Sequence, residues 1–250
     1  MERHVSDEAD NIGETIEARR ASVDLPANEL AHPEWERARP ALLARYWSGE
    51  PAPAGRHAEA RLLWTTDALS ARFVCRQAEP YVVSDAPRLD AKTVGLWERD
   101  VCEVFLAPDA RRPEHYFEFE AAPTGEWLDL ELLQLAERRD TNWDYRSGVT
   151  VAASRAEDSY TVALRVPWSA LTDAGSAASL TKDASESLVK DSTHGDDARH
   201  APRAGDIWRV NLYRCVGAGP GRGYLAWRPT ETPQPNFHVP RKFGRLLFVE

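Results

Sequence analysis

Glu103 is a single carboxylate in the middle of an apolar run, within residues 97–108, WERDVCEVFLAP. Two further glutamates, Glu118 and Glu120, alternate with aromatic residues in residues 115–125, HYFEFEAAPTG. Because side chains alternate across a β-strand, Glu118 and Glu120 point to the same face of their strand. If the two segments are neighbouring strands, we expect all three carboxylates on one face of a sheet.

A third segment, residues 126–133 with the sequence EWLDLELL, extends this pattern. Its alternation separates three leucines from Asp129 and Glu131. If the three segments form a meander, we expect one face of the sheet to carry five carboxylates, with Tyr, Phe and Trp among them. Like charges opposite one another on neighbouring strands destabilise a sheet by roughly 0.2 to 1 kcal/mol per pair, so such a face needs compensation.

Several kinds of compensation remain open at this point. In the structural interpretation the face is solvated and has arginine partners such as Arg209 or Arg214. In the functional interpretations it hydrogen-bonds sugar hydroxyls, binds a calcium ion, or supplies a catalytic pair of acids. Carboxylates accept several hydrogen bonds and indole rings cover the apolar faces of pyranoses, so this mixture of residues suits a sugar site.

The C-terminal third of the chain holds the other candidate binding residues. In residues 206–217, DIWRVNLYRCVG, the alternation turns Arg209 and Asn211 away from the core. Trp227 directly precedes a proline-rich segment, and proline stiffens a loop by fixing φ, which would preorganise an exposed aromatic ring. Trp227 is therefore a candidate ligand platform, although ordinary core packing explains it equally well.

Short strands must position these residues. About ten apolar or alternating segments with turn signals between them predict an all-β fold, an antiparallel β-sandwich of jelly-roll or immunoglobulin-like type with short helical turns. Residues 1–22 are charged and are predicted to be a flexible N-terminal tail. Residues 23–250 are predicted to be one domain, with a flexible insertion at 172–205 that is rich in Ser, Ala and Asp.

Composition excludes several classes of function. The net charge of -9 and the pI of 5.4 argue against a nucleic-acid partner, because the basic residues are interleaved with acids. No apolar run is long enough for a membrane helix, and the N-terminal residues do not form a signal peptide. The sequence as it stands predicts a cytoplasmic protein, or a secreted or periplasmic one if a leader was removed. The three cysteines are predicted to be buried free thiols.

Motifs along the chain resemble one known family. The residues that carry the resemblance are HPEWERA (32–38), LWERDVCEVFLAP (96–108), YFEFEAAPTGEWLD (116–129), VPWSAL (166–171), GDIWRVNLYR (205–214) and YLAWRPTETPQPNFHVPRKFGRLLF (224–248). Together they are similar to the family-nine carbohydrate-binding modules, and in particular to a stand-alone, family-nine-like bacterial branch. The match runs in order from about residue 31 to residue 248 and is broken mainly by the insertion.

The resemblance implies a β-sandwich related to the haem- or sugar-binding DOMON domains, with a mono- or oligosaccharide bound between two tryptophans. By motif, Trp97 would be one platform, Trp227 the second, and Glu103 the carboxylate that accepts hydrogen bonds from sugar hydroxyls. Six extended residues span ~20 Å, so the chain must turn near Arg99 and Asp100 if Trp97 and Glu103 contact one pyranose.

This sequence departs from the family pattern on the next strand. The sugar-binding modules carry Arg and Asn there, whereas this chain has Glu118 and Glu120, so specificity need not transfer. Family members also bind structural calcium, for which Asp100, Asp109 and Asp144 are candidate ligands, but no loop shows a clear calcium-binding pattern.

Two alternatives to a binding domain stay open. The first is a glycoside hydrolase in which Glu118 pairs with Glu103 or Glu120. The second is a haem-binding redox domain of the DOMON type, for which His238 is the best-placed ligand. The chain has one methionine, Met1, so an axial Met and His pair is not expected in the folded domain.

Overall fold

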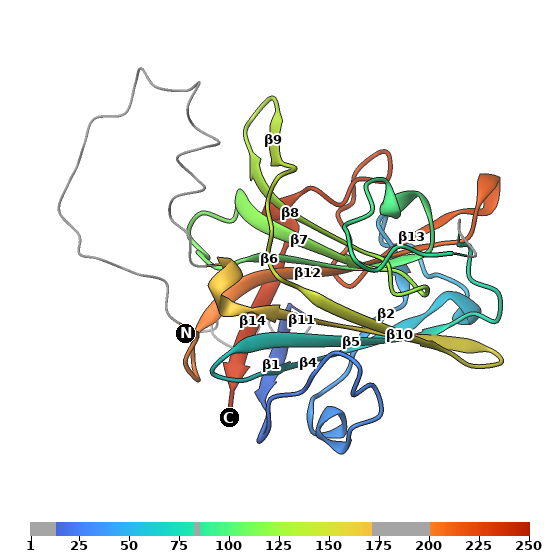
Figure 1. The fold of residues 1–250 in the computed structure, drawn as a ribbon. Coiled ribbons are helices and arrows are strands. Elements are labelled where there is room, and N and C mark those ends of the chain that lie inside the picture. The colour runs from blue at the N-terminus through green and yellow to red at the C-terminus, as the bar shows by residue number, and fades with distance from the viewer. Residues whose placement is uncertain (1–13, 83–85, 172–200) are drawn as a thin grey trace, which may run out of the picture.

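The computed structural model describes residues 14–82, 86–171 and 201–250, and within them the chain is all-β (Figure 1). The strands that build the sheets are β1 Thr15–Arg20, β2 Ala41–Leu43, β3 Arg45–Tyr46, β4 Ala58–Trp64, β5 Ala68–Arg76, β6 Val101–Ala107, β7 His115–Ala121, β8 Trp127–Gln134, β9 Arg139–Asn142, β10 Thr150–Arg155, β11 Ser159–Pro167, β12 Ile207–Val216, β13 Gly223–Ala226 and β14 Gly244–Val249. The helical turns are η1 Pro33–Arg37, η2 Ala54–Arg56, η3 Leu96–Glu98, η4 Trp168–Leu171, η5 Gly219–Gly221 and η6 Pro240–Lys242. None of the helices in the described part of the chain is long and apolar enough to cross a membrane.

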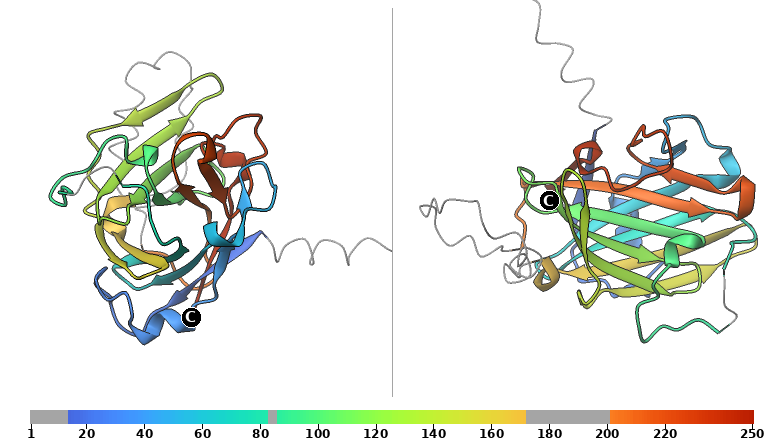
Figure 2. Two further views of the ribbon diagram at one scale, coloured as in Figure 1. Left: turned by 90° about the vertical axis from the view of Figure 1, so that its right-hand side faces the viewer. Right: turned by 90° about the horizontal axis from the view of Figure 1, so that it is seen from above.

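The strands form two layers that face each other, which confirms the predicted β-sandwich (Figures 1 and 2). One layer has the order β10-β11-β5-β4-β1 and the other the order β12-β6-β7-β8-β9. Strand β14 joins them, because it pairs with β1 on one side and with β12 on the other. The pairing is antiparallel except that β1 runs parallel to both β4 and β14.

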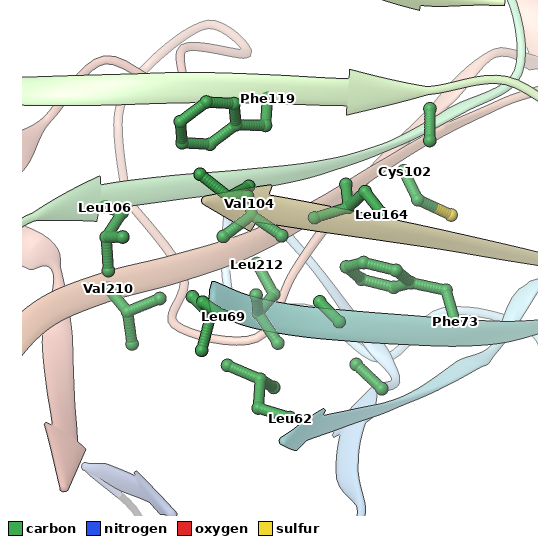
Figure 3. Packing of buried hydrophobic residues seen from close by; sticks show 14 of the residues in the cluster. Leu62, Leu69, Phe73, Cys102, Val104, Leu106, Phe119, Leu164, Val210 and Leu212 are labelled. Atoms are coloured by element: carbon green, nitrogen blue, oxygen red, sulfur yellow. The ribbon is translucent and has the colours of Figure 1, made fainter. Parts of the chain in front are cut away.

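The main hydrophobic core lies between the layers (Figure 3). Alternation sends Cys102, Val104 and Leu106 of β6 into it, where they meet residues of the opposite layer such as Leu69 and Phe73. The same alternation sends the other side chains of β6 to the face of the second layer that is turned away from the core, which we call the outer face. The predicted division of β6, β7 and β12 into two faces is therefore confirmed.

The outer face has a hydrophobic cluster of its own. Phe105, Tyr116 and Leu130 pack there against Phe237 and Phe243, which belong to the segment of residues 228–243 that follows β13. We call this segment the covering segment. Because it shields the outer face from water, side chains on both faces of the second layer are buried.

The predicted tail, residues 1–22, is wrong for its last part. Residues 1–13 lie outside the described residues, but Thr15–Arg20 forms β1 between β4 and β14. Only Ile16 and Ala18 of this strand are buried, so its apolar alternation is short and surrounded by charge. Of the predicted insertion at 172–205, residues 172–200 also lie outside the described part. The three cysteines are free and buried, as predicted.

Candidate functional site

Three glutamates meet on the outer face because β6 and β7 pair in the predicted way. The register sets Glu103 opposite Glu120 and sets Phe105 opposite Glu118. On its other side Glu103 lies opposite Tyr213 of β12. Taking one carboxylate oxygen from each of Glu103, Glu118 and Glu120, the three atoms lie within 4.8 Å of one another. We call these three residues the glutamate triad.

The prediction of five carboxylates on this face is wrong. Strand β8 does continue the meander, but its register places Leu130 opposite Glu118 and Asp129 opposite Phe119. The leucines of β8 therefore share the outer face with the triad, while Asp129 and Glu131 lie on the other face. Leucine suits the outer face because the covering segment shields this face from water, so that its apolar side chains form a second hydrophobic cluster.

The structural interpretation of a solvated acidic face is also wrong. Glu103, Glu118 and Glu120 are only 2%, 3% and 1% exposed. The proposed arginine partners lie elsewhere. Arg214 points to the opposite face, where its guanidinium donates to the backbone oxygens of Arg56 and His57.

Few groups compensate the charge of the triad. The Cys215 thiol donates to Glu103 Oε1 at 3.4 Å, whereas no described residue donates a hydrogen bond to either oxygen of an ionised Glu120. Burial raises the pKa of Glu103 and of Glu120 well above the usual range, and the neighbouring glutamates raise both further. Burial also raises the pKa of Glu118. An isolated negative charge is therefore unfavourable at each of these positions.

A pocket of about 310 Å³ opens beside the triad. Its walls come from the second layer, from the turn before β6 and from the covering segment. The lining residues are Trp97, Glu103, Glu118, Leu130, Leu132, Arg139, Thr141, Trp143, Cys215, Tyr224, Pro235, Asn236, Phe237 and His238. Glu120 is not among them and lies behind the wall, next to Glu103. The pocket thus combines aromatic and aliphatic surface with carboxylates, an arginine and an amide.

Trp97 reaches the pocket because the chain turns just before β6, as predicted. It lies in the helical turn η3, and the backbone becomes extended at Arg99. The turn is held by Arg222, whose guanidinium donates to the backbone oxygens of Trp97, Glu98 and Arg99. Asp100 closes it from the other side by accepting hydrogen bonds from the backbone nitrogens of Tyr81 and Gly217.

Trp143, which was not predicted from the sequence, is the second tryptophan of the pocket. The Trp97 and Trp143 ring centroids are 6.3 Å apart and the ring planes are inclined by 46°. Both rings reach solvent, with exposed fractions of 37% and 46%. The residue follows β9 directly, and an isolated Trp after the polar sequence RRDTN was the one available signal.

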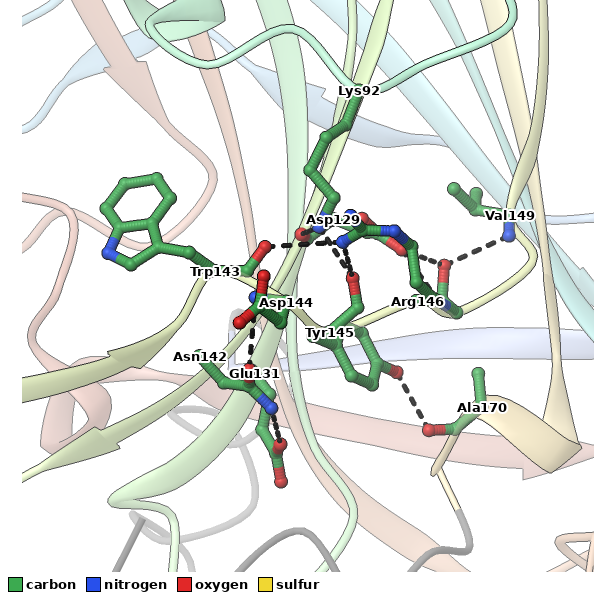
Figure 4. Close-up of polar contacts among 11 residues, drawn as sticks. Lys92, Asp129, Glu131, Asn142, Trp143, Asp144, Tyr145, Arg146, Val149 and Ala170 are labelled. Atoms are coloured by element: carbon green, nitrogen blue, oxygen red, sulfur yellow. Dashed lines mark hydrogen bonds and ion pairs between the residues drawn. The ribbon is translucent and has the colours of Figure 1, made fainter. Parts of the chain in front are cut away.

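The segment that carries Trp143 is fixed by a buried polar cluster (Figure 4). Lys92 Nζ lies 2.6 Å from Asp129 Oδ1 and also donates to the backbone oxygen of Tyr145 at 2.6 Å. Asp129 Oδ2 accepts hydrogen bonds from the backbone nitrogen and hydroxyl of Ser147. Asp129, which was expected among the acidic residues of the site, therefore holds the segment behind Trp143.

Glu131 fixes β9 in a similar way. Its Oε2 accepts a hydrogen bond from Asn142 Nδ2 at 3.0 Å, and its Oε1 lies 2.9 Å from His115 Nε2. Asn142 is the residue directly before Trp143. The two carboxylates of β8 thus act on the pocket only through the segment that they anchor.

The remaining predicted site residues do not line the pocket. Trp227 packs against the main core, and its ring lies so close to Gly244 that a Cβ there would be 2.3 Å from it. Asn211 is buried and hydrogen-bonds the backbone oxygen and nitrogen of Arg228, at the start of the covering segment. Arg209 donates a long hydrogen bond to the backbone oxygen of Phe243.

His238, the candidate haem ligand, lies in a packed corner of the pocket. Its Nδ1 is hydrogen-bonded to the Tyr116 hydroxyl at 2.8 Å, and its ring contacts that of Phe105. Burial lowers the pKa of His238 to about 3, and the charge of Arg139 contributes. A neutral imidazole 3.9 Å from Glu118 Oε2 does not balance that carboxylate.

The aspartates named as candidate calcium ligands do not converge. Asp100 is fully buried and both of its oxygens accept hydrogen bonds. Asp109 pairs with Arg111 and Arg112, and Asp144 is exposed. Within the described residues, the glutamate triad is the one group of three or more acidic, His or Cys side chains close enough together to share an ion.

Comparisons with known proteins agree on one fold. A family model described as carbohydrate family 9 binding domain-like matches residues 29–202. Among curated proteins, no sequence matches the chain. A candidate carbohydrate-binding protein from Bacteroides uniformis ATCC 8492 has a similar structure, with 18% identity, a TM-score of 0.66 and coverage of 94% of this chain and 99% of that chain.

Two further similar structures are of a carbohydrate binding module family 9 from Caldicellulosiruptor kristjanssonii. The complex with cellotriose is 13% identical with a TM-score of 0.57, covering 94% of this chain and 93% of that chain. The complex with glucose is 14% identical with a TM-score of 0.56, covering 94% of this chain and 95% of that chain. At these identities the similarity establishes the fold.

Proposed function

Because the chain belongs to the carbohydrate family 9 binding domain-like family, we propose that it is a non-catalytic carbohydrate-binding domain. Its ligand in this proposal is a mono- or oligosaccharide, bound through one sugar end in the pocket between η3, β9 and the covering segment. The similar modules in complex with glucose and with cellotriose support this class of ligand.

The main support for the proposal is that two exposed indole rings and two carboxylates line the same pocket. Trp97 and Trp143 offer apolar surface that suits the C–H faces of a pyranose, while Glu103 and Glu118 accept hydrogen bonds from hydroxyls. Arg139 and Asn236, which also line the pocket, add donors. The volume of about 310 Å³ lies at the lower end of the usual range for ligand pockets, which suits one or two sugar rings.

The two indoles form an open corner and not a parallel clamp. A pyranose held between parallel rings needs two contact gaps of about 3.5 to 4 Å, or about 7 to 8 Å between centroids. The observed separation is 6.3 Å with a tilt of 46°. In this proposal the sugar lies against the inner surface of the corner, with Trp97 as the platform nearer to Glu103.

Isothermal titration against a panel of mono- and disaccharides, glucose and cellotriose tests the proposal. Stacking on one platform contributes about 1 to 2 kcal/mol, so Trp97→Ala and Trp143→Ala should each weaken binding roughly 5- to 30-fold. Leu42→Ala is the matched control, because this exposed side chain lies on β2 and not in the pocket.

Two results would contradict the proposal. One is the absence of binding at millimolar sugar by a folded protein. The other is a measured affinity that neither tryptophan substitution changes. Release of reducing ends from an oligosaccharide, lost in Glu118→Gln, would instead assign the protein to the glycoside hydrolases.

A further inference from the structure

The glutamate triad brings three carboxyl groups together with few partners among the described residues around it. Each of its three residues is at most 3% exposed. Glu103 receives one weak hydrogen bond from the Cys215 thiol, and Glu118 Oε2 has no hydrogen-bond partner. Both oxygens of Glu120 also lack a partner among the described residues when the group is ionised, whereas a proton on Glu120 would be donated to Glu118. A buried carboxylate without a hydrogen bond or counter-charge costs several kcal/mol, so each group either keeps a proton, which its raised pKa favours, or takes a cationic partner from outside the described residues.

Nearby cations do not supply that partner. Among the described residues, the one ion pair of the triad joins Glu118 Oε2 to the neutral His238 at 3.9 Å, and Arg139 acts on Glu118 only as a charge at longer range. Arg222 lowers the pKa of Glu103 only as a distant charge, because its guanidinium is engaged with the backbone of the η3 turn. A cation that balances the ionised triad would therefore have to come from outside the described residues.

The geometry of the triad suits a metal ion. Oxygen ligands bind Ca²⁺ at about 2.3 to 2.6 Å, so two oxygens that share one ion lie at most about 5 Å apart. One oxygen from each triad carboxylate lies within 4.8 Å of the other two. The unpartnered carboxylate of Glu120 belongs to this group and lies opposite Glu103 in the sheet. All three ligands project from paired strands, so the arrangement is preorganised.

We propose that the glutamate triad binds a hard divalent cation of the Ca²⁺ class at the base of the pocket. Three carboxylates supply up to six oxygens, and water or sugar hydroxyls can complete the coordination from the pocket, which Glu103 and Glu118 also line. The oxygen-only ligand set favours Ca²⁺ or Mg²⁺ over Zn²⁺ or Cu²⁺, which prefer nitrogen and sulfur. The cation site exists without a bound sugar and so does not depend on the proposed function.

The test uses the full chain and the ion alone, with no sugar present. The protein is stripped with EDTA, exchanged into chelator-free buffer and titrated with CaCl₂ and separately with MgCl₂ by calorimetry. We expect one ion per chain and a higher melting temperature with the ion than in EDTA. Glu120→Gln preserves side-chain volume and lies outside the pocket wall, and it should weaken the ion affinity by about ten-fold or more.

Glu126→Gln is the matched control, because Glu126 is a similarly buried glutamate, 5% exposed, that is outside the triad. It should leave the ion affinity unchanged. If Glu120→Gln does not fold, Glu120→Asp tests the same position with a shortened carboxylate and a displaced ligand atom. The proposal is overturned if the folded wild-type protein binds neither ion at millimolar concentration, or if the Glu120 variants bind it as tightly as the wild type.

Discussion

Lys92→Met removes the cation that holds the Trp143 segment, and it should destabilise the protein strongly. The wild-type ammonium lies 2.6 Å from Asp129 Oδ1 and donates to the backbone oxygens of Asp129 and Tyr145. The Lys92 side chain is 9% exposed and that of Asp129 0%, so methionine fills the space but leaves a buried carboxylate without its counter-charge. Removing one partner of a buried ion pair costs about 3 to 5 kcal/mol.

Urea unfolding followed by circular dichroism measures this free energy. Combining Lys92→Met with Asp129→Asn removes both charges, so the double variant should lose about 1 to 3 kcal/mol less than the sum of the single variants. Sugar affinity should fall in the folded Lys92→Met protein, since Trp143 would no longer be fixed. A loss of stability below about 0.5 kcal/mol, which is typical of an exposed ion pair, would refute the account of this segment.

Three further predictions concern the pocket, the core and the triad. Arg222→Met frees the backbone oxygens of the turn that carries Trp97, and titration calorimetry should show sugar affinity reduced by about five-fold or more. Gly244→Ala places a methyl group against the Trp227 ring, so the free energy of unfolding should fall by about 1 to 3 kcal/mol. Sugar affinity should stay unchanged. A ten-fold weaker sugar affinity in the folded variant would contradict the assignment of Trp227 to the core. The ordinary pKa of a glutamate in the unfolded chain is about 4.5, and in the folded protein without an ion the pKa values of Glu103 and Glu120 are well above it. In EDTA the folded triad therefore keeps protons at pH values at which the unfolded chain has released them. Unfolding free energy measured by urea titration should therefore fall as pH rises from about 4.5, by about 1.4 kcal/mol per pH unit for each retained proton, and the slope should be shallower in Glu120→Gln.

Strand alternation predicted the faces of β6, β7 and β12, because each of these strands separates its two sets of side chains clearly. It could not predict which face of β8 joins the triad. Leucines of an alternating strand are expected to face the core between the layers, whereas Leu128 and Leu130 belong to the second apolar cluster under the covering segment. The position of a covering loop depends on contacts that are distant in the sequence.

The two tryptophans of the pocket differed in how far they could be predicted. Trp97 was found because it lies in a motif directly before β6, and a turn was needed to bring it near Glu103. Trp143 was missed because its position depends on Lys92 and Asp129, which lie 51 and 14 residues earlier in the chain. Trp227 was expected to line the site, but the absence of a side chain at Gly244 allows its ring to pack against the core.

Two-dimensional NMR of the indole N–H groups during a glucose titration tests the central claim most directly. The nine tryptophans give one indole signal each, and Trp97→Phe and Trp143→Phe assign the two signals of the pocket. If the sugar binds in the corner formed by these rings, both signals shift with saturation while that of Trp227 stays in place. Saturable shifts confined to other tryptophans, or no shift at millimolar glucose and cellotriose, would contradict the assignment of this pocket as the sugar site.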